Sequence, residues 1–215
     1  MNPRLAAWAA IVVLLAACQP SSPPQAQAAV KPARTDASPS PVLVAAARRQ
    51  IGVTRVYDPA YLEIPYPGGD VPADRGVCTD VVVRALRVDG LDLQQAIHED
   101  MRAHFNEYPQ TWGLNGPDRS IDHRRVPNQM RWFERQGWSQ ALSASRSDYP
   151  PGDIVAWKLS GSGLLHVGIV SDRKGRDGTP LILHNIGRGT QEEDLLFAHT
   201  IIGHYRPDLA GPRRR

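Results

Sequence analysis

Helical patterns occupy the first half of this 215-residue chain and strand patterns the second, and this order most constrains the fold. Between residues 91 and 105 an apolar side chain recurs at every fourth position, which is the spacing of an amphipathic helix. Helices are also predicted over residues 42–51, 78–88 and 126–136. Short apolar runs predict strands over residues 153–157, 166–170, 180–184 and 201–205. Helices followed by an antiparallel meander indicate an α+β fold.

The N-terminus has the pattern of a secretory signal. Arg4 precedes 13 apolar residues, a run too short to span a bilayer. The run ends in Leu15-Ala16-Ala17-Cys18, which resembles the lipobox of bacterial lipoproteins. The resemblance implies that Cys18 carries the lipid, and Gln19 in place of Asp favours the outer over the inner membrane. A plain cleaved signal is the alternative interpretation.

Four segments are predicted along the chain. They are a signal peptide at 1–17, a Pro-, Ser- and Ala-rich tether at 18–41, one domain at 42–209 and a basic, frayed tail at 210–215. Within the domain, the Pro- and Gly-containing stretch 53–76 is predicted to be a loop.

Charge disfavours one class of protein, and cysteine content excludes another. The chain has 25 Lys and Arg against 22 Asp and Glu, with no basic run among aromatic residues, which disfavours a nucleic-acid partner. Two cysteines are too few for a disulfide-stapled scaffold. If Cys18 is lipidated, Cys78 is the single thiol left in a disulfide-permissive compartment. It is then either buried and inert or kept free for a function.

Cys78 begins a predicted helix, and this position suits a reactive thiol. Free backbone N–H groups and the positive end of the helix dipole favour a thiolate there, and a neighbouring His⁺ lowers a cysteine pKa further. His166 and His184 each stand at the end of a predicted strand, where a lone histidine is usually a satisfied polar group. Together, the order Cys, His and a second polar ring is that of nucleophile, base and orienting residue.

The runs GVCTD (76–80), PGDIVAW (151–157) and HVGIV (166–170) resemble the NlpC-type and CHAP-type papain-like cysteine peptidases. The resemblance implies N-terminal helices packed on a small antiparallel sheet. It assigns the nucleophile to Cys78, the base to His166 and the third residue to His184, with Asn185 as its alternative.

A closer resemblance covers residues 45–206. It is carried by YPGGDVP (66–72), HEDM (98–101), IDHRRVPN (121–128) and HNIG (184–187). These runs are similar to a bacterial domain-of-unknown-function family within the NlpC-type superfamily. Two features depart from the superfamily pattern: Val77-Cys78-Thr79-Asp80 replaces Asp-Cys-Ser-Gly, and a helical insertion at about 91–137 separates the nucleophile from the base.

The His, Asp and Arg residues of the insertion have two functional interpretations, a metal site and a substrate clamp. His98 and His104 are six residues apart and do not share a helix face as His-Glu-x-x-His ligands do, so neither a metal nor a cofactor is predicted. Two interpretations of the run Asp122-His123-Arg124-Arg125 stay open. One is a helix approach with an acidic cap and exposed arginines, and the other is that Arg124 or Arg125 clamps a substrate carboxylate.

The sequence thus predicts a lipid-anchored, periplasm-facing thiol hydrolase. Its expected partners are the membrane, through the anchor, and peptidoglycan stem peptides or other envelope peptides, which it would cleave as an endopeptidase or amidase. The alternatives are a non-catalytic envelope-binding or scaffolding module on the same fold, and a transferase that uses the same thiol.

Overall fold

A five-stranded antiparallel sheet forms the second half of the domain. The computed structural model describes residues 41–209, so the predicted signal peptide, Cys18, the tether up to residue 40 and the basic tail lie outside the described residues. The strands are β3 (Ile154–Lys158), β4 (Leu165–Lys174), β5 (Pro180–His184), β6 (Gln191–Glu193) and β7 (Thr200–Tyr205), in the spatial order β6-β5-β4-β3-β7. This confirms the predicted mixture of helices and an antiparallel sheet.

One strand of the sheet was not predicted. The four strands expected from apolar runs are present, but β6 consists of Gln191, Glu192 and Glu193, all half-buried. Three polar residues carry no apolar period, so nothing local marks them as a strand. They form one because β5 offers an unpaired edge, with His184 opposite Gln191.

All four predicted helices are present. They are α1 (Pro41–Arg48), α2 (Cys78–Val88), α3 (Leu93–His104) and α4 (Val126–Arg135). Three short 3₁₀ helices accompany them: η1 (Phe105–Glu107), η2 (Asp122–Arg124) and η3 (Arg146–Asp148). The Asp92 side chain caps α3 by accepting the Gln94 N–H at 3.1 Å.

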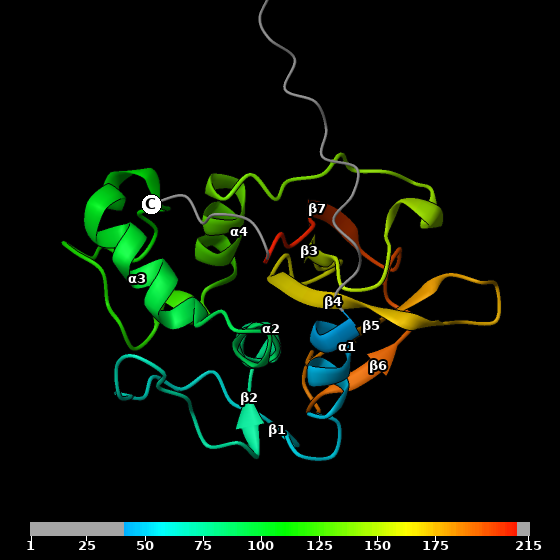
Figure 1. Ribbon diagram of the computed structural model, residues 1–215, viewed down its shortest axis with the longest axis horizontal. Helices are drawn as coiled ribbons and strands as arrows, with labels where there is room; N and C mark the ends of the chain where they lie inside the picture. The colour runs from blue at the N-terminus through cyan, green and yellow to red at the C-terminus, as the bar shows by residue number, and fades with distance from the viewer. Residues whose placement is uncertain (1–40, 210–215) are drawn as a thin grey trace, which may run out of the picture. The chain divides into compact units, whose positions relative to one another are not determined.

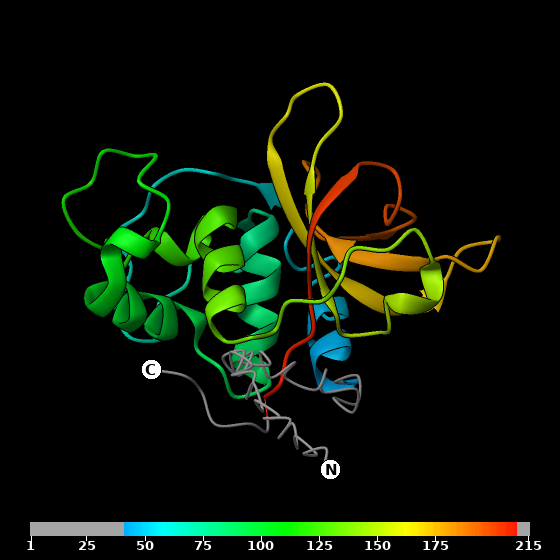
Figure 2. The ribbon, with the colours of Figure 1, turned by 90° about the horizontal axis from the view of Figure 1, so that it is seen from above.

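Helix α2 is central to the helical layer. Figures 1 and 2 show it between α1 and α3, and it contacts α1, α3 and strand β4. Val81, Val82 and Val83 are buried in one apolar cluster with Val167 and Ile169 of β4. Burial of each valine contributes about 1.5–3 kcal/mol. This packing holds the first turn of α2, which begins with Cys78, beside the start of β4.

The sheet buries apolar side chains on both faces. In β3, Ile154 and Ala156 belong to the cluster shared with the helices, whereas Val155 and Trp157 belong to a second cluster with Tyr149. This alternation is the two-residue period of a strand.

The stretch before α2 is irregular, as predicted, apart from one short pairing. β1 (Val56–Tyr57) pairs in parallel with β2 (Arg75–Gly76), directly before Cys78. The insertion folds back on α2, because its 3₁₀ helix η2 contacts α2, α3 and α4. No helix within residues 41–209 is both long and apolar enough to cross a membrane.

Candidate active site

Cys78 is the first residue of α2, and its thiol is buried. The residue is 4% exposed. Burial raises the pKa of the thiol to about 11, while the backbone N–H groups of Val167 and Thr79 favour the thiolate and oppose this increase. The helix position alone predicted a lowered pKa. The structure reverses that sign because the cost of placing a charge in an apolar environment exceeds the stabilisation from the N–H groups.

His166, the second residue of β4, is also buried. The peptide N–H that links it to Val167 faces the Cys78 thiol, so the backbone next to His166 adjoins the sulfur. Its ring packs on Trp157, with ring centroids 5.9 Å apart. Burial, with a smaller contribution from His184, lowers the pKa of His166 to about 3. The imidazole is therefore neutral at physiological pH.

His184 ends β5 and links His166 to a carboxylate. Nδ1 of His184 lies 3.1 Å from Nε2 of His166, and its Nε2 lies 3.1 Å from Oε2 of Glu193. Glu193, the last residue of β6, also forms an ion pair with Arg188. Burial lowers the pKa of His184, and the Glu193 carboxylate opposes this effect. The structure thus joins two histidines that are 18 residues apart and adds an acid that the sequence did not indicate.

This row of groups indicates which nitrogen of His166 could act as a base. The Glu193 carboxylate, paired with Arg188, accepts a hydrogen bond, so Nε2 of His184 carries the proton. Nδ1 of neutral His184 is then an acceptor, and Nε2 of His166 donates to it. It follows that Nδ1 of His166 carries a free lone pair, which is what a general base requires.

Gly168 allows the two histidine-bearing strands to approach. A Cβ atom at this position would lie 2.7 Å from Cγ2 of Ile182 and 3.2 Å from Cβ of His184. A side chain larger than hydrogen would push β5, and His184 with it, away from β4.

Asn185 lies outside the histidine row. Its Nδ2 donates to the carbonyl oxygen of Gly76 at 2.9 Å, and the residue is fully buried. It therefore ties the loop after β5 to the residues that precede Cys78.

The candidate substrate-binding residues of the insertion have partners inside the protein. Arg124 is buried and forms an ion pair with Asp80, where the sequence suggested an exposed arginine or a substrate clamp. Arg125 donates to Asp122 at 2.9 Å, and its guanidinium lies 4.0 Å from the ring centre of Trp112. Burial raises the pKa of Asp122 to about 6 and lowers that of His123 to about 4.

The other histidines of the insertion are separate from one another. His98 packs edge-on against Tyr66, with ring centroids 5.0 Å apart, whereas Nδ1 of His104 lies 3.3 Å from Oδ1 of Asp100. Within residues 41–209, no group of three or more His, Cys, Asp or Glu side chains is arranged to hold a metal ion.

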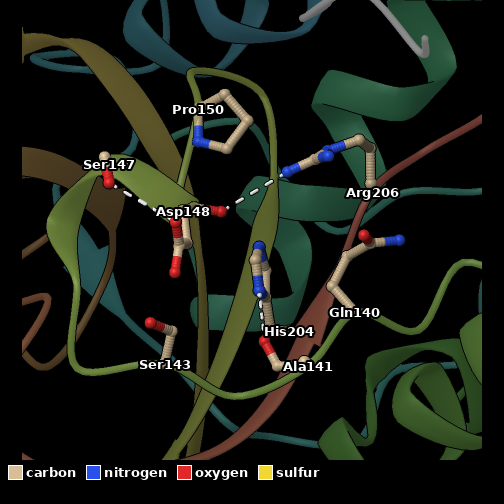
Figure 3. A pocket seen from close by; sticks show the side chains of 8 residues that line it. All are labelled: Gln140, Ala141, Ser143, Ser147, Asp148, Pro150, His204 and Arg206. Atoms are coloured by element: carbon tan, nitrogen blue, oxygen red, sulfur yellow. Dashed lines mark hydrogen bonds between the residues drawn. The ribbon is translucent and has the colours of Figure 1, made fainter. Parts of the chain in front are cut away.

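A pocket of about 380 Å³ lies elsewhere on the domain (Figure 3). Its two basic side chains, His204 and Arg206, both bind the buried carboxylate of Asp153. None of its lining residues is Cys78, His166 or His184. They are Gln140, Ala141, Ser143, Ser147, Asp148, Pro150, His204 and Arg206.

Comparisons with known proteins identify the family of this chain. Residues 44–207 match the model of a family described as "Domain of unknown function (DUF1287)". Over 160 residues the chain is 59% identical to the "Uncharacterized protein YijF" of Escherichia coli (strain K12), which covers 74% of this chain and 78% of that protein.

A solved structure shows a more distant similarity. It is a protein from Staphylococcus aureus subsp. aureus Mu50 described as similar to lipoprotein, NLP/P60 family, with 15% identity and a TM-score of 0.39. The match covers 80% of this chain, which spans only 44% of that one. The expectation of a domain-of-unknown-function family is confirmed by the match over residues 44–207, and this chain belongs to the DUF1287 family.

Proposed function

We propose that this protein is a thiol hydrolase that cleaves amide bonds, with Cys78 as the nucleophile and His166 as the base. The observation that carries the proposal is the hydrogen-bonded row His166–His184–Glu193, which leaves a lone pair on Nδ1 of His166. A buried row of this kind orients a base, as the third residue of a catalytic triad does. The resemblance of the runs around Cys78 and His166 to papain-like peptidases supports the same assignment.

The reaction follows from the protonation states of the site. Nδ1 of His166 takes the thiol proton while the Cys78 sulfur attacks the amide carbonyl carbon. The backbone N–H of Cys78 stabilises the resulting oxyanion. The C–N bond breaks as His166 returns the proton to the leaving amine, and water then hydrolyses the thioester with His166 again acting as base. Because burial disfavours a standing thiolate–imidazolium pair, the proton moves during the attack.

The substrate class and the location belong to the same proposal. The lipobox-like run ending at Cys18 and the resemblance to NlpC-type peptidases support a lipid-anchored enzyme in the cell envelope, at the outer membrane. Peptides of the envelope, with peptidoglycan stem peptides first among them, are then its substrates. If the predicted segment 18–41 is a flexible tether, its length lets the domain stand about 25–30 Å off the membrane surface.

One observation favours a second candidate function, a non-catalytic module that binds the cell envelope. Cys78 is 4% exposed, and burial raises the pKa of its thiol to about 11. An inert cysteine that only fills space beside β4 has these properties as well.

The test is hydrolysis of peptidoglycan fragments by the full chain. Wild type should release products with a new amine and a new carboxyl group, heavier by one water in total, and Cys78→Ala and His166→Ala should release none. His104→Ala, which removes a histidine of α3, is the matched control and should retain activity. Binding of the fragments without cleavage, unchanged in Cys78→Ala, would support the binding module instead. Products that carry an acceptor in place of water would indicate a transferase.

A further inference from the structure

A buried ion pair joins the first turn of α2 to the insertion. Nε of Arg124 donates to Oδ1 of Asp80 at 2.8 Å, and Nη2 donates to Oδ2 at 3.0 Å. Both side chains are 3% exposed. Two parallel hydrogen bonds between a guanidinium and a carboxylate give the pair a defined orientation as well as a strong interaction.

The remaining contacts of Arg124 also point into the protein. Nη1 donates to the carbonyl oxygen of Ala60 at 3.0 Å, and Nη2 lies 3.3 Å from that of Asp58. The backbone oxygen of Arg124 accepts from the Thr79 hydroxyl at 2.9 Å. Arg124 therefore contacts Thr79, the residue after the nucleophile, and the stretch before α2. Its guanidinium binds the Asp80 carboxylate and not a substrate carboxylate.

Asp80 connects this pair to the nucleophile. It is the third residue of α2, and its Oδ2 accepts the backbone N–H of Val77 at 2.6 Å. Gly76 leaves room for that carboxylate, since a Cβ there would lie 2.8 Å from Oδ2 of Asp80 and φ is +153°. The carboxylate thus fixes the backbone on the N-terminal side of Cys78.

The charge of Asp80 affects the ionisation of the Cys78 thiol, together with the other groups around the sulfur. From α2, the Asp80 carboxylate raises the pKa of Cys78. From β4, the Val167 N–H favours the thiolate, and His166 is neutral. From β1, Tyr57 interacts electrostatically with Cys78, Asp80 and Arg124. Arg124 is the cation in direct contact with the carboxylate, and its charge offsets that of Asp80.

We propose that Arg124 is a positioning residue for the nucleophile, which fixes the first turn of α2 through Asp80 and cancels the negative charge two residues from the Cys78 thiol. The inference deepens the proposed function and rests on it, because a positioning residue matters when Cys78 attacks a substrate. It gives the helical insertion a role in the chemistry of a thiol on another element.

The test is the alkylation of Cys78 by iodoacetamide in the full chain at neutral pH. The reaction is followed by mass spectrometry of the Cys78 peptide, which separates it from Cys18. Arg124→Gln leaves the Asp80 charge unbalanced and should slow alkylation about tenfold, the effect of one pKa unit. Asp80→Asn keeps an oxygen for the Val77 N–H but leaves the Arg124 charge unbalanced, so alkylation should accelerate by a similar factor. The double variant should return to near the wild-type rate, and Arg124→Lys should lie between wild type and Arg124→Gln.

A pair with a purely structural role gives a different pattern. Loss of either partner would then expose the buried thiol, and both single variants would react faster; that result would overturn the inference. Circular dichroism identifies any variant that unfolds. If Arg124→Gln does not fold, the comparison of Asp80→Asn with the double variant tests the inference. The inference predicts that adding Arg124→Gln to Asp80→Asn slows alkylation. A purely structural role predicts no slowing. Alkylation needs no substrate, so failure of this inference is separate from absence of hydrolysis, which would refute the proposed function.

Discussion

Nε2 of His166 lies 3.1 Å from Nδ1 of His184, and this contact joins the neighbouring strands β4 and β5. The row continues to Glu193 on β6 and to Arg188 in the connection between β5 and β6. A carboxylate at the end of the row sets the proton positions of both rings. The His166 ring is therefore oriented by a histidine and an acid together.

Replacing Glu193 by Gln should reduce the kcat of hydrolysis about 10²-fold, because an uncharged amide no longer holds the proton on Nε2 of His184. Hydrolysis of a peptidoglycan fragment measures this effect. Glu192→Gln is the matched control, since the neighbouring Glu192 contacts Arg48 and Ser171 and not the histidines. Equal losses in the two variants would indicate damage to β6 and not a role of Glu193.

The pH dependence of kcat/KM follows from the two buried groups. The pKa of His166 is lowered to about 3, so its imidazole is already neutral in mildly acidic solution. The pKa of Cys78 is raised to about 11, so its thiol stays protonated in mildly alkaline solution. The reactive thiol and neutral imidazole therefore coexist between these values. With a substrate that does not titrate, kcat/KM should be nearly flat from about pH 5 to about pH 9. A fall in kcat/KM on the alkaline side with a midpoint well below pH 11 would instead indicate a thiolate–imidazolium pair, which loses the imidazolium proton there.

Gly168→Ala should reduce both stability and hydrolysis. The added methyl group would lie 2.7 Å from Ile182 and would separate β5 from β4, which lengthens the contact between His184 and His166. Overpacking of this kind costs about 1–3 kcal/mol of unfolding free energy, which urea denaturation measures. Gly116→Ala is the matched control, because no atom lies within 4 Å of a Cβ at that position. Full activity in Gly168→Ala would show that the spacing of the two histidines is not critical.

Asp153→Ala should destabilise the fold without removing any contact of the candidate active site. Asp153 is 2% exposed and accepts from Nε2 of His204 at 2.6 Å and from Nε of Arg206 at 3.0 Å. Its removal leaves buried donors without an acceptor and should cost about 3–5 kcal/mol in urea denaturation. Glu99→Ala, at an exposed position of α3, should stay within about 0.5 kcal/mol of wild type. A small loss in Asp153→Ala would mean that His204 and Arg206 find other acceptors.

Two features that distinguish this sequence from the NlpC-type runs it resembles lie in one contact. Asp80 stands two positions after Cys78, and Arg124 belongs to the predicted helical insertion. Their side chains pair in the interior, 44 residues apart along the chain. Nothing in either local sequence indicates the partner, so the sequence left Arg124 open as a substrate clamp.

Local patterns determined the helices, the four apolar strands and the place of Cys78 at a helix start, because each depends on periodicity and capping within a few residues. Family membership followed from runs that the chain carries on its own. The polar strand β6 was missed because its three polar residues carry no apolar period and only pairing with β5 makes them a strand. Tertiary structure alone decided the contact of Glu193 with His184, the pairing of Arg124 with Asp80 and the sign of the Cys78 pKa shift. These depend on which distant groups pack together and on how completely they exclude water, and desolvation of a thiol outweighs the helix N-terminus that the sequence shows.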